Sequence, residues 1–457
     1  MRRSTKLSCR LVVVVAALAG GAAANGRFPR AQQLVVDPAN PDHLMLRSTY
    51  GLLLSEDAGQ KWSWVCEQSV GYSGSEDPGV GITKDGALLA GMFDGLAVSH
   101  DRGCDFAFVG GGLDARYVVD LSVEKQNPAH AVAMVSMGVG TGTFLNQVWQ
   151  TVDDAKTWTQ LGPDAGDDFL SLTIDSAPSD PDVLYASGLA SGQGILLHST
   201  DHAGTWQRTS IDGSDSEHTP FIGAVDPNDP SIVYVRLNGT DEDVLLRSTD
   251  AGQTWQELLR GKADLTGFAL SPDGATVAAG FNDPGDETVW GLWRAASSDL
   301  TFSHVYTSPI ACLTWTAAGL YACTSQFKSG FELGISADDG KTFEAVMHLT
   351  DLSGPLECAA DTSSGKFCPP RWQAVCETIG KCTGGSGGDA GTVDGGSGGG
   401  GTGSGATGGS DVNGQPGGDA GSGGCGCRAP GGGGNGTGAL GVAIVALLLH
   451  GAGRRRR

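Results

Sequence analysis

Positive charge is scarce in this 457-residue chain, which has 29 Lys and Arg against 51 Asp and Glu. The first 24 residues and the residues after Cys427 hold nine of the basic residues and no acidic one. Residues 25–427 therefore carry 20 basic residues against 51 acidic ones, a formal charge of −31. A surface of this sign repels nucleic acid and anionic membranes. We expect the main part of the chain to bind neither.

The motifs of several enzyme classes are missing as well. The chain has no G-x-S-x-G, no H-E-x-x-H, no phosphate-binding loop and no C-x-x-C pair of the kind that binds zinc. No catalytic residue and no metal site is indicated. A glycoside hydrolase stays an alternative, because it needs only two carboxylates at a suitable separation and acids are plentiful here.

Long apolar runs are also absent, and the two short ones lie at the ends. The first, in residues 1–24, follows basic residues and precedes small ones, which predicts a signal peptide cleaved after Ala24. The second, in residues 439–453, is shorter than the roughly 20 residues of a permanent membrane span and is followed by four arginines. Before it, residues 383–424 are almost entirely Gly, Ser, Thr, Ala and Asp, which predicts a disordered linker.

Residues 425–457 combine Cys425 and Cys427, the apolar run and the arginine cluster. This ending resembles the myxobacterial C-terminal sorting signal MYXO-CTERM. The resemblance implies processing and lipid attachment near the two cysteines, and a location at the cell surface or outer membrane, with or without release to the outside. A plain hydrophobic tail anchor is the alternative. In both cases membrane contact is expected through this segment only.

Eight further cysteines remain, an even number, which favours disulfides in an oxidising compartment. They are Cys66, Cys104, Cys312, Cys323, Cys358, Cys368, Cys376 and Cys382. In "ACLTWTAAGLYACTS" a hairpin would place Cys312 opposite Cys323, close enough to bridge. We also expect Cys66 to pair with Cys104, and the last four cysteines to pair among themselves in one of three ways.

One eight-residue pattern recurs: "SEDAGQKW", "SHDRGCDF", "TVDDAKTW", "STDHAGTW", "STDAGQTW", "AASSDLTF" and "SADDGKTF". We call these segments the octets. They end on aromatic residues spaced 41 to 52 residues apart, namely Trp62, Phe106, Trp158, Trp206, Trp255, Phe302 and Phe343. Six carry an aspartate at the third position: Asp57, Asp101, Asp153, Asp201, Asp250 and Asp338. Such a period, with short apolar strands between turn signals, is typical of propeller blades.

Each repeat supplies four strands. Two apolar runs flank a Pro/Asp/Asn/Gly turn, as in "LVVDPANPDHLMLRS", a third run leads into the octet and a fourth follows it. We therefore predict an all-β chain with a monomeric seven-bladed β-propeller of four-stranded antiparallel blades over residues 25–350. A Cys-rich closing segment (351–382), the disordered linker (383–424) and the tail with its short membrane segment (425–457) complete the chain.

The octets resemble the Asp-box, or BNR repeat, with the pattern S/T-x-D-x-G-x-T-W/F. Their role is predicted to be structural, because a catalytic residue is needed once and not seven times. The carboxylate and hydroxyl would bond to the backbone of the turn, and the aromatic would pack between sheets. Ala155 and Ala203 stand where glycine is usual, and the sixth octet lacks the Ser/Thr, Asp and Gly, so these three turns are expected to be looser or differently shaped.

Asp-box families include sialidases, xyloglucanase-type glycosidases, sortilin-type receptors and photosystem II assembly factors. The repeats here look most like those of the assembly-factor and sortilin-type group. A sialidase is disfavoured, because its Arg-Ile-Pro motif is missing and Arg47, Arg247 and Arg294 fall on blade sides. The resemblance and the net charge together favour a binding module for an extracellular protein or glycan. The alternative is a glycoside hydrolase, sialidase-like or specific for a neutral polysaccharide.

Strand direction also locates the binding face. If strands alternate, the octets and the first-to-second turns share one face, and the irregular connections share the other. Variable loops on a rigid scaffold usually carry function. Their acids would give that face a negative rim suited to a basic partner or to Ca²⁺, the only cofactor suggested: Asp167, Asp168, Asp215, Glu217, Asp241, Glu242, Asp243, Asp283, Asp286 and Glu287.

Overall fold

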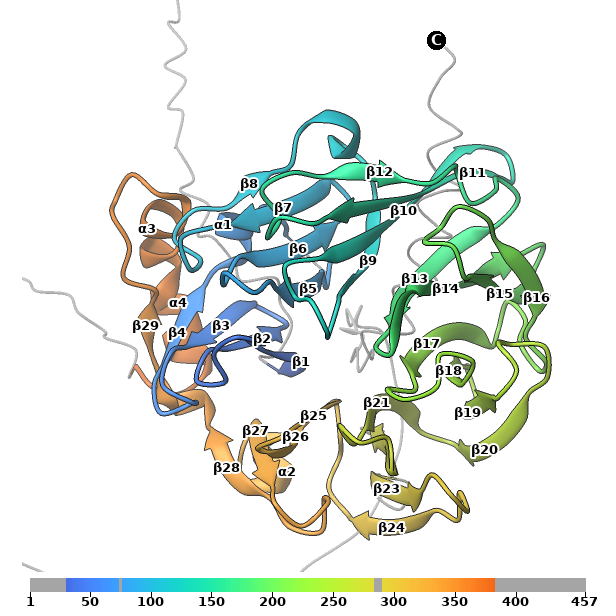
Figure 1. The fold of residues 1–457 in the computed structure, drawn as a ribbon. Coiled ribbons are helices and arrows are strands. Elements are labelled where there is room, and N and C mark those ends of the chain that lie inside the picture. The colour runs from blue at the N-terminus through green and yellow to red at the C-terminus, as the bar shows by residue number, and fades with distance from the viewer. Residues whose placement is uncertain (1–29, 74–75, 283–289, 383–457) are drawn as a thin grey trace, which may run out of the picture. The chain divides into compact units, whose positions relative to one another are not determined.

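Seven sheets follow one another around a central axis in the computed structural model, which describes residues 30–73, 76–282 and 290–382 (Figure 1). Six sheets have four strands and one has five, and within each blade the four strands are antiparallel neighbours in chain order. The chain is thus the all-β, seven-bladed propeller that the octet spacing predicts.

The first four blades lie between residues 31 and 210. Their strands are β1 (Ala31–Val36), β2 (Leu44–Ser48), β3 (Gly51–Ser55) and β4 (Trp62–Val65); β5 (Gly79–Ile82), β6 (Leu88–Met92), β7 (Gly95–Ser99) and β8 (Ala107–Phe108); β9 (Val118–Val123), β10 (Ala131–Gly140), β11 (Thr143–Thr151) and β12 (Thr159–Leu161); and β13 (Leu170–Ala177), β14 (Asp180–Ala190), β15 (Gln193–Ser199) and β16 (Gln207–Ser210). Helices α1 (Glu67–Val70) and η1 (Gly111–Leu113) lie in connections between these blades.

Three blades and a closing segment follow. They contain β17 (Thr219–Val225), β18 (Val233–Asn238), β19 (Asp243–Ser248) and β20 (Gln256–Gly261); β21 (Asp264–Leu270), β22 (Thr276–Asn282), β23 (Gly291–Ala296) and β24 (Ser303–Tyr306); β25 (Cys312–Thr316), β26 (Gly319–Cys323), α2 (Gln326–Ser329), β27 (Leu333–Ser336) and β28 (Glu344–Met347); and η2 (Leu349–Asp351), β29 (Leu352–Pro355), α3 (Ser363–Phe367), η3 (Pro369–Arg371) and α4 (Trp372–Thr378). No helix in the described part of the chain is long and apolar enough to cross a membrane.

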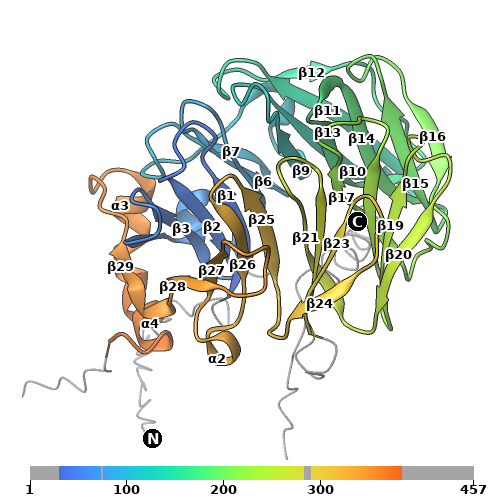
Figure 2. The ribbon, with the colours of Figure 1, turned by 60° about the horizontal axis from the view of Figure 1, so that its bottom comes forward.

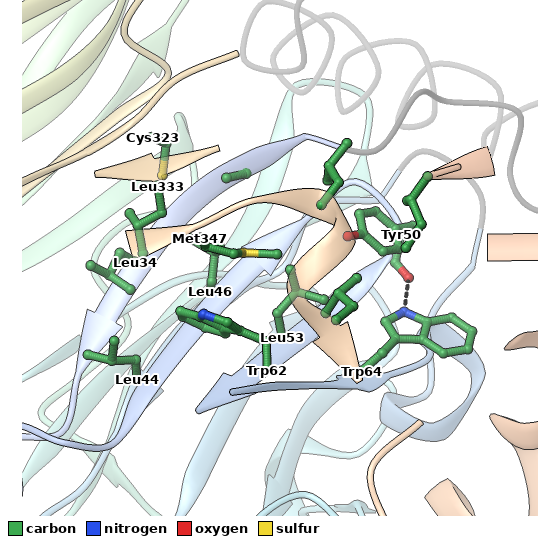
Figure 3. Packing of buried hydrophobic residues seen from close by; sticks show 14 of the residues in the cluster. Leu34, Leu44, Leu46, Tyr50, Leu53, Trp62, Trp64, Cys323, Leu333 and Met347 are labelled. Atoms are coloured by element: carbon green, nitrogen blue, oxygen red, sulfur yellow. Dashed lines mark hydrogen bonds between the residues drawn. The ribbon is translucent and has the colours of Figure 1, made fainter. Parts of the chain in front are cut away.

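The hydrophobic core lies between blades rather than at one centre. A blade has two faces, each packed against a neighbour, so its inner strands are apolar on both sides. At the seam between blade 7 and blade 1, Leu34 and Leu46 pack with Leu333 and Met347 (Figure 3). Trp62, the aromatic of the first octet, is fully buried in the same cluster. The ring therefore closes on apolar packing between its first and last blades.

Six of the seven octet turns pair the hydroxyl of the first position with the aspartate of the third, and the fifth octet shows the pattern in full. The Ser248 hydroxyl donates to Asp250 at 2.8 Å and accepts the Gly252 N–H at 2.8 Å. Asp250 also accepts the N–H and the hydroxyl of Thr254, at 2.8 and 2.7 Å. These bonds, the Thr254 hydroxyl foremost, lower the pKa of Asp250 to about 2. The carboxylate is thus occupied inside its own turn.

Two of the three octets that depart from the pattern keep this geometry, contrary to expectation. Ala155 and Ala203 take the left-handed backbone that glycine usually supplies, with φ of 62° and 61°. Their N–H groups still donate to Thr151 and Ser199, each at 2.9 Å. Both alanines are buried in core clusters, so packing of the methyl group offsets part of the backbone strain.

The sixth octet differs, as expected. No hydroxyl receives the N–H of its turn, and the Asp299 and Leu300 N–H groups donate instead to the Ala296 carbonyl, at 3.3 and 2.9 Å. The Asp299 carboxylate accepts the Thr301 N–H, at 2.9 Å. This turn therefore lacks the hydroxyl and carboxylate pair that holds the others.

The closing segment runs along the outside of blade 1, where β29 pairs in parallel with β4 (Figures 1 and 2). It then reaches blade 2, where the Ser364 N–H donates to the Cys104 carbonyl at 2.9 Å. A fifth strand on blade 1 was not predicted. The closing segment therefore packs on the outside of blades that are already complete. None of the seven described blades takes its four strands from both ends of the propeller.

This path corrects the predicted disulfides. Cys312 does pair with Cys323, in the expected hairpin. Cys66 and Cys104 do not pair with each other: the bonds are Cys66–Cys368 and Cys104–Cys358. Of the last four cysteines, only Cys376 and Cys382 pair with each other, so the expectation that all four pair among themselves is wrong as well. The prediction failed because the closing segment returns beside β4 and the second octet and so supplies both partners.

The two faces of the ring follow strand direction. The Ala58 N–H of the first octet donates to the Asp42 carbonyl of the first-to-second turn at 2.8 Å, and Ala251 donates to Ser231 at 2.9 Å in blade 5. These turns form what we call the octet face. The second-to-third and blade-to-blade connections lie at the opposite ends of the strands and form the loop face.

Candidate binding face

The loop face is built up most in blades 3 and 4. The hairpins β10–β11 and β14–β15 include strands of 10 and 11 residues, while most strands in the other blades have four to seven. Both long hairpins turn through glycine, Gly142 and Gly192, with φ of 67° and 82°. The extra length extends this side of the ring beyond the octet scaffold.

Several predicted site acids are already paired within the protein. Asp168 forms a salt bridge with Arg208 at 2.7 Å, and Glu242 pairs with Arg260. Asp215 accepts the N–H groups of Glu217 and His218, at 2.8 and 2.7 Å, which lower its pKa.

Asp243 does not lie on the exposed rim of the loop face, contrary to expectation. It is buried and accepts the N–H groups of Gly239 and Leu265 at 2.7 and 2.6 Å, and burial raises its pKa. It therefore fastens blade 5 to blade 6. Asp283, Asp286 and Glu287 lie outside the described residues.

The structure brings two of the predicted loops together at the junction of blades 4 and 5. His218 packs so closely against Gly239 that a side chain there would lie 2.8 Å from its ring. Glu217 and Asp241 lie on these two loops, are exposed, and make no ion pair within the described residues. Exposed Asp167, on the connection before β13, likewise has no ion pair there. These three acids remain available to a partner.

A partly exposed apolar cluster lies on the inner part of the same face. Leu170 and Leu172 of the innermost strand β13 are buried, and bulky side chains from neighbouring blades pack over them. We call the whole group the mouth cluster: Phe93, Phe144, Leu170, Leu172, Leu189 and Phe221. Tyr117 extends it, with its ring centroid 5.5 Å from that of Phe93.

The sequence does not predict the mouth cluster. Its members come from blades 2, 3, 4 and 5 and occupy different strand positions in each, so no repeat register connects them. The only sequence signal is that Phe93, Phe144 and Phe221 each stand at or near a loop-face strand end.

The three arginines that a sialidase would need make their contacts within or between blades, as expected. The Arg47 guanidinium donates to the Asp77 and Pro78 carbonyls of blade 2 at 3.1 and 2.8 Å. Arg294 pairs with Asp339 of blade 7 at 3.1 Å. Arg247 lies over the Tyr234 ring, 5.8 Å from its centroid. They do not converge into a carboxylate-binding group.

A cavity of about 600 Å³ opens on the octet face between blades 1 and 2. Leu44, Met45 and Ile82 line it, together with Leu356 of the closing segment. Carboxylates line it too, but Asp57 and Asp101 belong to octet turns, and no Phe, Tyr or Trp is among its lining residues. It lacks the aromatic surface expected of a polysaccharide-cleaving groove. Within the described residues no group of three or more His, Cys, Asp or Glu could hold a metal ion.

No protein-family model and no curated protein matches this chain. Solved structures do. An ancestral GH74 enzyme shares the fold at a TM-score of 0.53 and 14% identity, over 70% of this chain and 46% of the enzyme. The likeness is one of fold.

Two more distant structures resemble the chain less closely. A GH74 xyloglucanase from Xanthomonas campestris gives a TM-score of 0.33 at 16% identity, over 73% of this chain and 66% of that one. YCF48 bound to D1 peptide gives 0.34 at 16% identity, over 50% and 65%. The chain spans less than half of the ancestral GH74 enzyme and just under two thirds of the other two.

Proposed function

We propose that this chain is an exported, surface-held propeller that binds an extracellular protein or glycan through its loop face. The observation that carries the proposal is the mouth cluster, a partly exposed apolar surface on the face that also holds exposed acids without an ion pair in the described part of the chain. Exposed apolar surface rimmed by polar groups marks interaction sites.

The covalent chemistry supports export. All eight cysteines between residues 66 and 382 form disulfides, which persist in oxidising compartments. The signal-like N-terminus and the MYXO-CTERM-like tail support a route to the cell surface. The octet turns support assignment to the Asp-box group, in which the repeated residues build the scaffold and the loops carry the activity.

Export and anchoring are tested on the whole protein in its own cells. Replacing Cys425 and Cys427 by serine should release or mislocalise the protein while leaving its thermal unfolding unchanged, because neither residue belongs to the propeller. Surface labelling and fractionation measure the outcome. Unchanged surface retention would reduce the tail to an ordinary hydrophobic anchor.

Binding is tested with two variants of equal charge change. The loop-face variant carries Asp167→Asn, Glu217→Gln and Asp241→Asn. The octet-face variant carries Asp42→Asn, Glu344→Gln and Glu357→Gln, three exposed acids that also have no ion pair in the described part of the chain. The whole protein is used to capture partners from the extracellular material of its own cells and on a glycan array. Loss of partners in the loop-face variant alone is expected, and equal loss in both would exclude this face as the site.

Hydrolysis of a glycan is the competing function, and the same array measures it. Release of reducing ends from an arrayed polysaccharide by the wild-type protein would replace the binding proposal with the hydrolase one. Two carboxylates in an aromatic-lined groove would be needed for that activity. The cavity between blades 1 and 2 does not supply the aromatic surface.

A further inference from the structure

We propose that the loop face recognises an arginine-rich polypeptide segment, whose guanidinium groups stack on the mouth cluster and pair with the acids around it. This inference rests on the proposed function and names the chemistry of the partner. It draws on three observations: a shared apolar platform, acids without ion pairs on the same face, and an arginine of the chain already held by an aromatic ring and a carboxylate.

The platform is aromatic as well as apolar. Phe93, Phe144 and Phe221 come from three different blades and pack on the buried Leu170 and Leu172. Their rings are partly exposed. Because the scaffold strands fix their positions, a partner can stack on these rings at small entropic cost. Aromatic faces attract cations, and arginine most often among side chains.

The charge around the platform suits a cation. Asp167, Glu217 and Asp241 are exposed, and Asp212 on the connection before β17 is exposed too. None of the four makes an ion pair within the described residues, whereas other acids of the same loops, such as Asp168 and Glu242, are neutralised by arginines. These four acids therefore bring negative charge to the loop face that no ion pair of the described residues offsets, and residues 25–427 as a whole are negative.

The chain itself shows how such a surface holds a guanidinium. Arg208 of β16 places its guanidinium carbon 5.8 Å from the centre of the Phe169 ring. The same group donates to both carboxylate oxygens of Asp168, at 2.7 and 2.8 Å. Phe169 and Asp168 are consecutive residues of the connection that leads into β13, the strand under the mouth cluster. An aromatic face and a carboxylate thus act together on an arginine of the outermost strand of the same blade.

Arginine fits this pattern better than the other cations. Its planar guanidinium stacks on rings, pairs with a carboxylate through two hydrogen bonds and is more weakly hydrated than an ammonium group. Calcium needs six to eight oxygen ligands gathered at one point, and the described acids are spread over separate loops. A neutral glycan would use the rings but leave the acids unpaired.

The test compares two cationic peptides of equal charge, fluorescein-labelled nona-arginine and nona-lysine. Their binding to the whole protein is followed by fluorescence anisotropy at physiological salt. We expect nona-arginine to bind at least about five-fold more tightly, since stacking on a partly desolvated ring contributes about 1 kcal/mol. The loop-face variant should lose at least about ten-fold of the nona-arginine affinity, and the octet-face variant less than about two-fold, because distant exposed charges are largely screened.

A second variant isolates the rings. Phe144→Leu combined with Phe221→Leu keeps apolar side chains but removes two aromatic faces. It should weaken nona-arginine about three-fold or more and leave nona-lysine unchanged, while thermal unfolding reports that the fold is kept. Loss of both peptides to the same extent would show that the rings act only as scaffold, which contradicts the proposal.

The outcomes separate this inference from the proposed function. Equal affinity for the two peptides, or equal loss in the loop-face and octet-face variants, overturns the arginine assignment. If the loop-face variant still loses its extracellular partners, the proposed binding function stands even though the arginine assignment fails. Selective binding of nona-arginine in a protein that captures no extracellular partner supports the chemistry and contradicts the function.

Discussion

The ring has a stapled side and an unstapled side. Blades 7, 1 and 2 and the closing segment contain all four disulfides, whereas blades 3 to 6 contain no cysteine. The unstapled side carries the long hairpins and most of the mouth cluster. The two sides thus differ in how they are held together. Disulfides cross-link the side where the two ends of the propeller meet, whereas apolar packing between consecutive blades holds the side that carries the candidate binding surface.

Removing the long staples should have the largest effect. Cys66–Cys368 and Cys104–Cys358 span 302 and 254 residues, so each limits the unfolded chain strongly. Replacing all four cysteines by serine should lower the free energy of unfolding by about 4–5 kcal/mol per bond. Denaturant unfolding measures it. The matched control is serine at Cys312 and Cys323, whose separation of 11 residues predicts a loss of only about 3 kcal/mol. Equal losses would mean that closure of the ring is not what the long staples stabilise.

The seam also depends on one buried carboxylate. Glu332 accepts the Ala31 N–H of blade 1 and the Gln326 N–H of its own blade, at 3.3 and 2.9 Å. Glu332→Ala should destabilise the protein by about 3 kcal/mol, since two buried donors lose their acceptor. Tyr185→Phe, which removes one hydrogen bond from blade 4 to the Pro230 carbonyl of blade 5, should cost only about 1 kcal/mol. The reverse order in thermal or denaturant unfolding would place the critical junction on the unstapled side.

On the unstapled side we expect a pH dependence. Burial raises the pKa of Asp120, which accepts the Ile174 N–H across blades 3 and 4, from 3.8 to about 7. The folded protein thus keeps this proton to a higher pH than the unfolded chain, so the stability it confers is complete below about pH 4 and lost as the pH rises through about 7. The wild type should lose ~2 kcal/mol more than Asp120→Asn over that range. Parallel pH profiles for the two proteins would contradict this assignment.

The octet aspartates are expected to give the opposite pH dependence of stability. With its pKa lowered to about 2, Asp250 contributes stability that is present above its ordinary value of 3.8 and is lost as the pH falls from there towards 2.

The smallest effect is expected at the alanines of the unusual octets. Ala203→Gly relieves the left-handed backbone but removes a buried methyl group, so stability should change by less than about 1 kcal/mol. Gly252→Ala, at the same octet position in blade 5, should cost more than about 2 kcal/mol, because its new methyl carbon would lie 2.4 Å from Leu196. Differential scanning calorimetry compares the two. Similar melting temperatures would mean that the octets tolerate either residue freely.

These contrasts also show what can be predicted from sequence. The octets predicted seven blades because each octet specifies the same local turn. The Cys312–Cys323 bond followed from a hairpin whose two cysteines are only 11 residues apart in sequence. The partners of Cys66 and Cys104 could not be found in this way, since they depend on where a segment some 250–300 residues later comes to lie.

The candidate site followed the same rule. Alternating strand direction assigned the loop acids to one face, but it could not show that Asp243 is buried between blades. Nor could it gather Phe93, Phe144 and Phe221 from three blades into one cluster.

The outer edges of the blades bear on how the propeller avoids aggregation. A free sheet edge can pair with the edge of another molecule, and such pairing leads to aggregation. In this propeller the edge of blade 1 is covered by β29, and the outermost strands of blades 2 and 3 are two and three residues long. The longest outer strand, β20, carries a register shift and the charged pair Glu257 and Arg260. At these four blades, edge-to-edge pairing with a second molecule is therefore disfavoured.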